Sequence, residues 1–109
     1  MKLVIAIVQD DDAADLVDVI TEKGFRVTKL ATTGGFLKSG NTTLMIGVEK
    51  EKVDTVLSLI EDMCKVRRQI VSSPSPVAGS TGVYVPYPIE VDIGGATIFV
   101  VDVDKFLRI

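Results

Sequence analysis

The feature that most restricts the fold is a strand pattern that is apolar on both faces. Residues 3–8 read LVIAIV, so each side chain is apolar whichever face it takes. Near the other end of the chain, residues 98–101 read IFVV and have the same property. Strands that are buried on both faces have this composition. The fold must therefore cover both faces of its sheet.

The order of strand and helix patterns predicts the α+β class. It reads β-α-β-β-α-β with an extra strand before the last one, which is the ferredoxin-like split βαβ arrangement. Right-handed crossovers place both helices on the same face of such a sheet. The expected strands are 2–8, 25–32 and 43–48, with a hairpin at 89–103 around Gly94-Gly95, and the expected helices are 10–23 and 50–66.

The second face of the sheet is left without a cover by this arrangement. An apolar sheet face of several hundred Å² in water is an aggregation hazard, so self-association is the simplest prediction. An alternative is that residues 72–88, a Pro/Ser/Gly stretch without periodicity, form a long loop that folds back over the face.

The first expected helix follows three aspartates, Asp10 to Asp12, and ends before Gly24. We interpret the acids as capping groups that favour the positive end of the helix dipole, rather than as a metal site. Its predicted apolar stripe is Ala14, Leu16, Val17, Ile20 and Thr21; that of the second helix is Val53, Val56, Leu57, Ile60, Met63 and Cys64.

Length and composition predict one domain, residues 1–109, in the cytoplasm. A single cysteine, Cys64, forms no internal disulfide, and its place on a helix stripe favours burial as a small hydrophobe. No apolar run is long enough to span a membrane. The net charge of −3 argues against binding a nucleic-acid polymer. We expect neither a cofactor nor a metal.

Positive charge is concentrated in one segment of this acidic chain. Lys23, Arg26, Lys29 and Lys38 lie in the range 23–38 without an acid among them. A local positive site suits a small anion better than a polymer. The alternative interpretation is that these four side chains are ordinary solvated cations.

The segment ATTGGFLKSGNTT, residues 31–43, suits a loop around a nucleotide. Glycines allow close backbone approach and supply N–H donors, and threonines and Asn41 supply polar groups. Phe36 and Leu37 offer apolar surface. On the preceding strand, Arg26 and Thr28 share one face. If the other face meets the helices, the two residues point to the uncovered face, and a ligand bound there lies between chains.

The chain resembles the PII-like cyclic di-AMP receptor family over nearly its whole length. The resemblance implies a PII-like homotrimer of ferredoxin-like subunits that binds cyclic di-AMP at subunit interfaces and has no catalytic activity. The segments that carry it are IAIVQD at 5–10, TKLATTGGFL at 28–37, GNTTL at 40–44, YVPYP at 84–88 and GGATIFV at 94–100.

The resemblance also implies ligand-binding residues. An arginine and a threonine on the second strand fall on Arg26 and Thr28, with Val27 between them. Two positions depart from the family pattern: Gly24 stands where relatives have asparagine, and Arg108 where they have glutamine. Arg108 is either a charge contact to phosphate or a solvated tail residue. The other implied ligand-binding positions are Gly35, Phe36, Leu37, Asn41, Gly47 and Phe99.

These residue types fit the implied ligand, which carries two phosphodiester charges and two adenines. Arg26 can pair with a phosphate, Asn41 can read an adenine edge, and aromatic side chains can stack on the bases. Each has a structural alternative: Phe99 also fits a core strand, Asn41 fits a turn, and Gly47 fits a bulge.

Three other functions remain open from the sequence. A sensor of ATP, ADP or another mononucleotide shares the fold, although its long effector loop joins the second and third strands, where this chain is short. An enzyme is disfavoured because the chain has no histidine and no nucleophile-plus-base arrangement. A purely structural module would need no small molecule. The leading prediction is a sensor whose segments 34–42 or 72–88 respond to cyclic di-AMP and signal to a protein target that the sequence does not identify.

Overall fold

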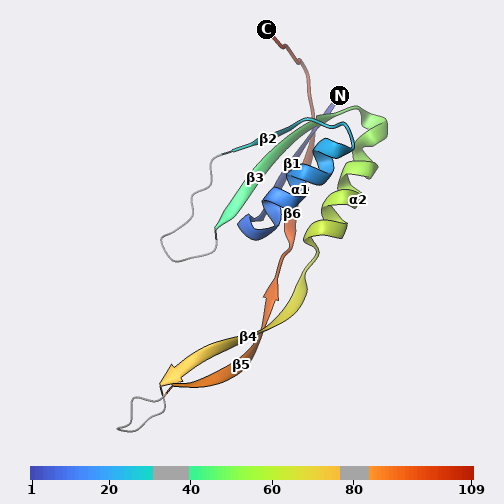
Figure 1. Ribbon diagram of the computed structural model, residues 1–109. Coiled ribbons are helices and arrows are strands. Elements are labelled where there is room, and N and C mark those ends of the chain that lie inside the picture. The colour runs from blue at the N-terminus through green and yellow to red at the C-terminus, as the bar shows by residue number, and fades with distance from the viewer. Residues whose placement is uncertain (31–39, 77–83) are drawn as a thin grey trace.

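A four-stranded antiparallel sheet carries two helices on one face, and a two-stranded ribbon projects from one end (Figure 1). The structure is a computed structural model and describes residues 1–30, 40–76 and 84–109. The elements are β1 (Lys2–Gln9), α1 (Asp10–Glu22), β2 (Val27–Lys29), β3 (Asn41–Val48), the 3₁₀ turn η1 (Lys50–Lys52), α2 (Val53–Cys64), β4 (Arg67–Pro76), β5 (Tyr84–Ile93) and β6 (Ala96–Asp102).

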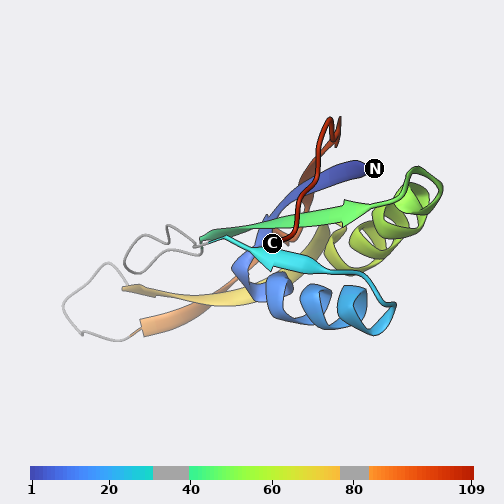
Figure 2. The same cartoon turned by 90° about the horizontal axis from the view of Figure 1, so that it is seen from above.

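The sheet has the strand order β2-β3-β1-β6, with every neighbouring pair antiparallel. The helix α1 joins β1 to β2, and α2 follows β3 on the way to β6. This is the ferredoxin-like arrangement that the sequence predicts, and both helices lie on the same side of the sheet (Figure 2).

The core lies between the helices and one face of the sheet. Alternate residues of the central strand β1, namely Val4, Ala6 and Val8, are buried there. The α2 stripe is confirmed, with Val56, Ile60 and Cys64 fully buried. The predicted α1 stripe is partly wrong, because Ala14 and Thr21 are exposed. Leu16 and Ile20 are buried as expected, together with Ala13 and Asp12.

The end of α1 explains Gly24. Gly24 has a φ of 90°, a conformation that side chains with a Cβ rarely adopt. Its N–H donates to the Thr21 carbonyl at 2.9 Å, and the Phe25 N–H donates to the Ile20 carbonyl at 3.2 Å. This pair of bonds is the Schellman motif, which satisfies carbonyls at the helix end. Gly24 is therefore explained by helix termination.

The ribbon corrects two sequence predictions. Residues 89–103 do not form a hairpin, because β5 pairs with β4 along its whole length and β6 pairs with β1. Nor are residues 72–88 a loop throughout, since β4 and β5 include residues 72–76 and 84–88. Residues 77–83 lie outside the described part of the chain. We call the paired strands β4 and β5 the arm.

Prolines account for the second error. Proline cannot donate to a strand ladder, so residues 72–88 do not read as strands in sequence. In a two-stranded ribbon each strand has one free edge, where a missing N–H leaves the pairing intact. Ten-residue strands at about 3.3 Å per residue are about 33 Å long, so the arm projects well beyond the sheet.

Gly94 and Gly95 form a corner at which the chain leaves the arm and enters the sheet. Their φ angles are 86° and 95°. A Cβ on Gly94 would lie 2.7 Å from the Lys65 carbonyl oxygen and 2.8 Å from an Arg67 guanidinium nitrogen. The Gly95 N–H also donates to the Cys64 carbonyl. Glycine is thus required at position 94 both by its conformation and by the lack of space.

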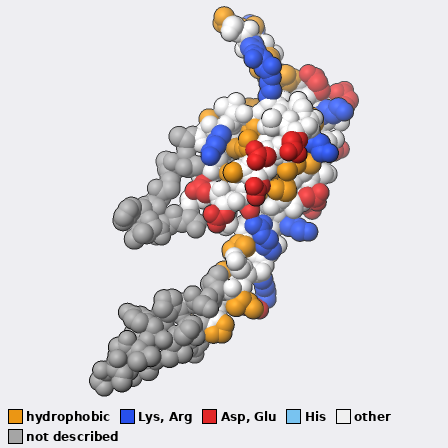
Figure 3. All heavy atoms as spheres, viewed as in Figure 1, with side chains coloured by type: hydrophobic (Ala, Val, Ile, Leu, Met, Phe, Trp, Pro, Cys, Tyr) orange, Lys and Arg blue, Asp and Glu red, His pale blue; other side chains and the backbone are white. Residues whose placement is uncertain are grey.

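The other face of the sheet is open among the described residues. Leu3, Ile5 and Ile7 of β1 are half-buried there, and Phe99 and Val101 of β6 are exposed. The described strands of the arm run away from the sheet (Figure 1), so they do not cover this face as the alternative prediction required. In the orientation of Figure 3, acidic side chains gather on the body of the molecule and basic ones near the arm base.

Candidate ligand site

Three of the predicted ligand-binding residues line one hollow on the open face of the sheet. Arg26, Thr28 and Gly47 border a cavity of about 320 Å³. The remaining lining is apolar and comes from both chain ends and the central strands: Met1, Leu3, Met45, Val103 and Phe106. A cationic group, a hydroxyl and a bare backbone segment thus surround an apolar floor.

Strand parity explains this convergence. Val27 is half-buried and packs against the core with Phe25, so Arg26 and Thr28 point the opposite way and are exposed. The predicted orientation of Arg26 and Thr28 is confirmed. The Val27 side chain lies on the helix side, so only its backbone can reach a ligand on the open face.

Arg26 contributes the cationic group of this cavity. None of the ion pairs found within the described ranges includes it. A guanidinium offers several N–H donors in one plane, which can pair with two oxygens of a phosphate. The Thr28 hydroxyl, two residues along the same strand face, adds a further donor or acceptor.

Gly47 lies in regular pairing, opposite Leu3 of β1, so it does not mark a bulge. Among the described residues, a Cβ at this position would meet only the Met1 sulfur, at 3.9 Å, which is an ordinary contact. The packing of the described residues therefore does not require glycine here.

Phe99 lies on the same face but on the far edge strand. The ladder runs from Thr28 to Met45, from Met45 to Ile5 and from Ile5 to Phe99. Three strand spacings of about 4.8 Å separate Thr28 from Phe99 by about 14 Å. Phe99 is 54% exposed, so it is not a core residue of this chain, and one chain does not bring it to the cavity.

Asn41 does not line this cavity either. It is the first residue of β3 and pairs with Gln9 at the opposite end of the sheet from Gly47. Six residues at about 3.3 Å each place Asn41 about 20 Å from Gly47. It borders a second hollow of about 350 Å³, together with Gln9, Gly94 and Thr97.

The remaining predicted residues divide into two groups. Gly35, Phe36 and Leu37 lie outside the described residues. Arg108 is exposed in the C-terminal tail, beyond the end of β6 at Asp102. The same tail contributes Phe106 to the cavity, while the Val103 N–H donates to the Met1 carbonyl at 3.2 Å.

Sequence reasoning missed the apolar floor of this cavity. Leu3 and Met45 had a signal, because strand parity and antiparallel pairing put them on the same face as Thr28. No sequence pattern pointed to Met1, Val103 and Phe106, because they lie outside the strands and come together only in the folded chain.

A third cavity, of about 460 Å³, lies between α2 and β6. Its lining is largely aliphatic and includes Leu57, Ile98 and Val100, together with one acid, Glu61, and one cation, Lys65. None of the predicted ligand-binding residues lines it. Cys64 also lines it, and burial raises the pKa of this thiol to about 11, so it stays protonated at neutral pH.

Two of the three aspartates at the start of α1 have structural partners. The helix begins at Asp10, and no side chain caps it from the preceding position, Gln9. The prediction of carboxylate caps is therefore wrong. The three acids lie in the first turn, where the helix dipole favours negative charge. Asp10 accepts a hydrogen bond from Thr42, and Asp12 pairs with Arg67. Within the described ranges, no three acidic or cysteine side chains are gathered as a metal site would require.

The fold and this site define a small ferredoxin-like α+β domain with the cationic side chain of Arg26 beside a cavity on an open sheet face. A sequence model of the cyclic-di-AMP receptor family matches residues 1–109, so the chain belongs to the cyclic-di-AMP receptor family. It is also similar to a solved structure of a functionally unknown protein from Pediococcus pentosaceus ATCC 25745. The two are 48% identical, the match covers 99% of this chain and 96% of the other, and the TM-score is 0.76.

Among the described helices, none combines the length and the apolar composition needed to cross a membrane.

Proposed function

We propose that this chain is a sensor that binds cyclic di-AMP between the subunits of a homotrimer. Binding changes the conformation of segments 34–42 or 72–88, and the changed surface acts on a protein target. The sensor catalyses no reaction and works in the cytoplasm. The described part of the proposed site contains a cation, hydroxyl and amide groups and apolar side chains, without a nucleophile-plus-base pair.

The observation that carries the proposal is the division of the predicted residues over one open face. Arg26, Thr28 and Gly47 share a cavity, while neither Phe99 nor Asn41 lines it: Phe99 lies about 14 Å from Thr28, and Asn41 about 20 Å from Gly47. A single chain does not enclose a ligand with these groups. A second copy packed against the face can bring its own Phe99 or tail to the cavity of the first.

The ligand's chemistry agrees with the lining. The two phosphodiester groups need cations and N–H donors, and the two adenines need apolar or aromatic faces. Arg26 meets the first need, and Phe106 and the methionines of the cavity meet the second. Coupling to a target further requires that the ligand bind two conformations with different affinity.

Isothermal titration tests the proposal with cyclic di-AMP as the titrant. We expect micromolar or tighter binding. Arg26→Ala should weaken binding by about tenfold or more, because a charge-assisted hydrogen bond is lost. Lys29→Ala is the matched control: it removes an exposed cation from the same strand but outside the cavity, and should bind as the wild type does.

Three outcomes would contradict the proposal. The first is no binding at micromolar concentration, and the second is ATP displacing cyclic di-AMP at equal concentration, which would favour a mononucleotide sensor. The third is formation of a linear dinucleotide on incubation, which would indicate an enzyme. Light scattering with and without ligand gives the subunit number, and a monomer under both conditions would remove the interface.

A further inference from the structure

The first turn of α1 contacts two parts of the chain that are far apart in sequence. On one side it holds the start of β3. The Asp10 N–H donates to the Gly40 carbonyl at 3.0 Å, and the Thr42 hydroxyl donates to the Asp10 carboxylate at 2.5 Å. These bonds fix the backbone on both sides of Asn41, a predicted adenine-binding residue.

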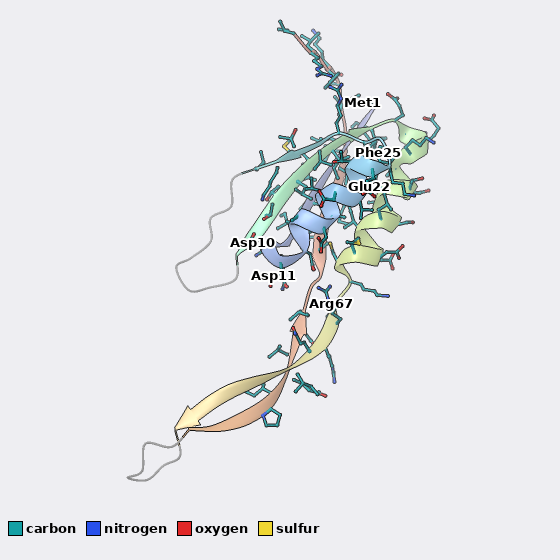
Figure 4. All side chains as sticks on the ribbon, in the orientation of Figure 1. Met1, Asp10, Asp11, Glu22, Phe25 and Arg67 are labelled. Atoms are coloured by element: carbon teal, nitrogen blue, oxygen red, sulfur yellow. The ribbon has the colours of Figure 1, made fainter. Side chains whose placement is uncertain are left out.

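On its other side the same turn holds the base of the arm. The Arg67 guanidinium donates to the two Asp12 carboxylate oxygens at 2.6 and 3.5 Å. The Gly94 N–H donates to the Gln9 side-chain oxygen at 2.8 Å. The bases of both arm strands are thus held, and Figure 4 shows Arg67 below the start of α1, where Asp10 and Asp11 are labelled.

The burial of the Asp12 carboxylate makes this attachment costly to break. Its side chain is only 8% exposed, whereas that of Arg67 is 41% exposed. A buried carboxylate that loses its partner is left uncompensated, which is strongly unfavourable. Arg67 is also held by the Lys65 carbonyl, at 3.3 Å, and lies against Gly94. A change in the angle of the arm therefore breaks the Asp12–Arg67 pair or displaces α1.

The hollow beside Asn41 joins these two parts. Its lining includes Asn41 from β3, Gln9 from the end of β1, and Gly94 and Gly95 from the corner below the arm. A ligand group that reaches Asn41 thus lies against the backbone that sets the direction of the arm.

We propose that Gln9 and Asp12 are positioning residues that link nucleotide binding at the Asn41 end of the sheet to the position of the arm. The inference rests on the proposed function, since it names how the ligand site is coupled to a surface that a target can read. By thermodynamic reciprocity, loosening the arm base must also change the affinity for the ligand.

The test compares hydrogen exchange of the arm with and without cyclic di-AMP, in the full chain. The reporters are the backbone amides of residues 67–73 and 89–93. Asp12→Asn removes the charge pair with little change of shape, and Arg67→Gln removes it with a shorter side chain. Arg68→Gln is the matched control, because Arg68 is 74% exposed and its ion pairs among the described residues are with Glu90 and Asp92 across the arm itself.

We expect cyclic di-AMP to change exchange at these amides in the wild type and in Arg68→Gln. In Arg67→Gln and Asp12→Asn this ligand-dependent change should be lost, and the affinity should shift by about fivefold. Circular dichroism establishes folding, and Arg67→Lys replaces a variant that does not fold. It keeps the cation but not the fork of donors, so a partial loss is expected.

Two failures can be told apart. If the wild type does not bind cyclic di-AMP, the proposed function fails and this link fails with it. If the wild type binds but Arg67→Gln and Asp12→Asn keep both its affinity and its arm response, the ligand site stands and the link alone is overturned. An arm that does not respond to bound ligand in the wild type also overturns the link.

Discussion

The two faces of the four-stranded sheet are built from the same strands but differ in how far their side chains are buried. Facing the helices, Val4, Ala6 and Val8 are at most 1% exposed. On the other face of the same strand, Leu3, Ile5 and Ile7 are half-buried, and Phe99 of β6 is 54% exposed. Within the part of the chain that the structure describes, one face is therefore covered by the helices and the other is open.

This difference separates stability from function. Side chains on the covered face hold the fold together through close packing, so substitutions there should lower the free energy of unfolding. Side chains on the open face contribute less to the single chain but line the predicted ligand site. Substitutions on the open face should instead alter subunit assembly and ligand binding.

The largest expected effect comes from a charge in the middle of the open face. Ile5→Lys should leave the protein monomeric, because an ammonium group buried without a partner in an interface costs several kcal/mol. Light scattering measures the change in mass. Asp18→Lys, on the exposed surface of α1, is the control for added charge and should assemble normally. If Ile5→Lys kept the wild-type mass, the open face would not be the interface.

On the covered face, Leu16→Ala should lower the free energy of unfolding by about 2–5 kcal/mol, because Leu16 is fully buried and the change leaves a cavity. Urea denaturation measures this loss. Asp15→Ala, an exposed position on the same helix, should change it by less than about 0.5 kcal/mol. A loss of similar size at both positions would mean that the core assignment is wrong.

Gly47→Ala adds a single methyl group on the open face, so it should weaken ligand binding without lowering stability. Inside the chain the new Cβ has room, so the urea midpoint should stay within error or rise slightly. At the floor of the cavity the methyl should obstruct the ligand and weaken binding by about tenfold, or about 1.4 kcal/mol. Titration calorimetry measures the affinity. Unchanged affinity would place the ligand away from Gly47.

The smallest effect is a dependence of stability on pH at Cys64. Burial raises the pKa of the folded-state thiol from 9.0 to about 11. Between these values the unfolded chain releases a proton that the folded chain keeps, so stability falls as the pH rises. Urea midpoints at pH 8.5 and about 10.5 measure this fall. Cys64→Ala should show a smaller fall, and an equal fall in both proteins would assign it to other groups.

Much of the fold was predictable because local patterns and strand parity decide it. The order of elements, the α2 stripe and the Schellman end at Gly24 all follow from short stretches of sequence. The shared orientation of Arg26 and Thr28 follows from the two-residue period of a strand. Each of these depends on interactions among neighbouring residues.

The arm was not predictable in the same way. Its prolines argue against strands, and Gly94-Gly95 has the chemistry of a hairpin turn. The structure uses the two glycines as a corner instead, and the Lys65 carbonyl and the Arg67 guanidinium leave no room for a side chain at Gly94. β5 pairs with β4 rather than β6, and no local pattern indicates this choice.

By itself, the sequence determined the two helices, the strands of the four-stranded sheet and their order, the face that these strands bury, and the presence of a cation and glycines suited to a small anion. Only the tertiary structure decided that Arg26 and Gly47 share a cavity with Phe106, that Asn41 lies at the far end of the sheet, and that Asp12 pairs with Arg67. The reason is physical: periodicity fixes the direction of a side chain within its own element, whereas meetings between distant residues depend on how whole elements pack.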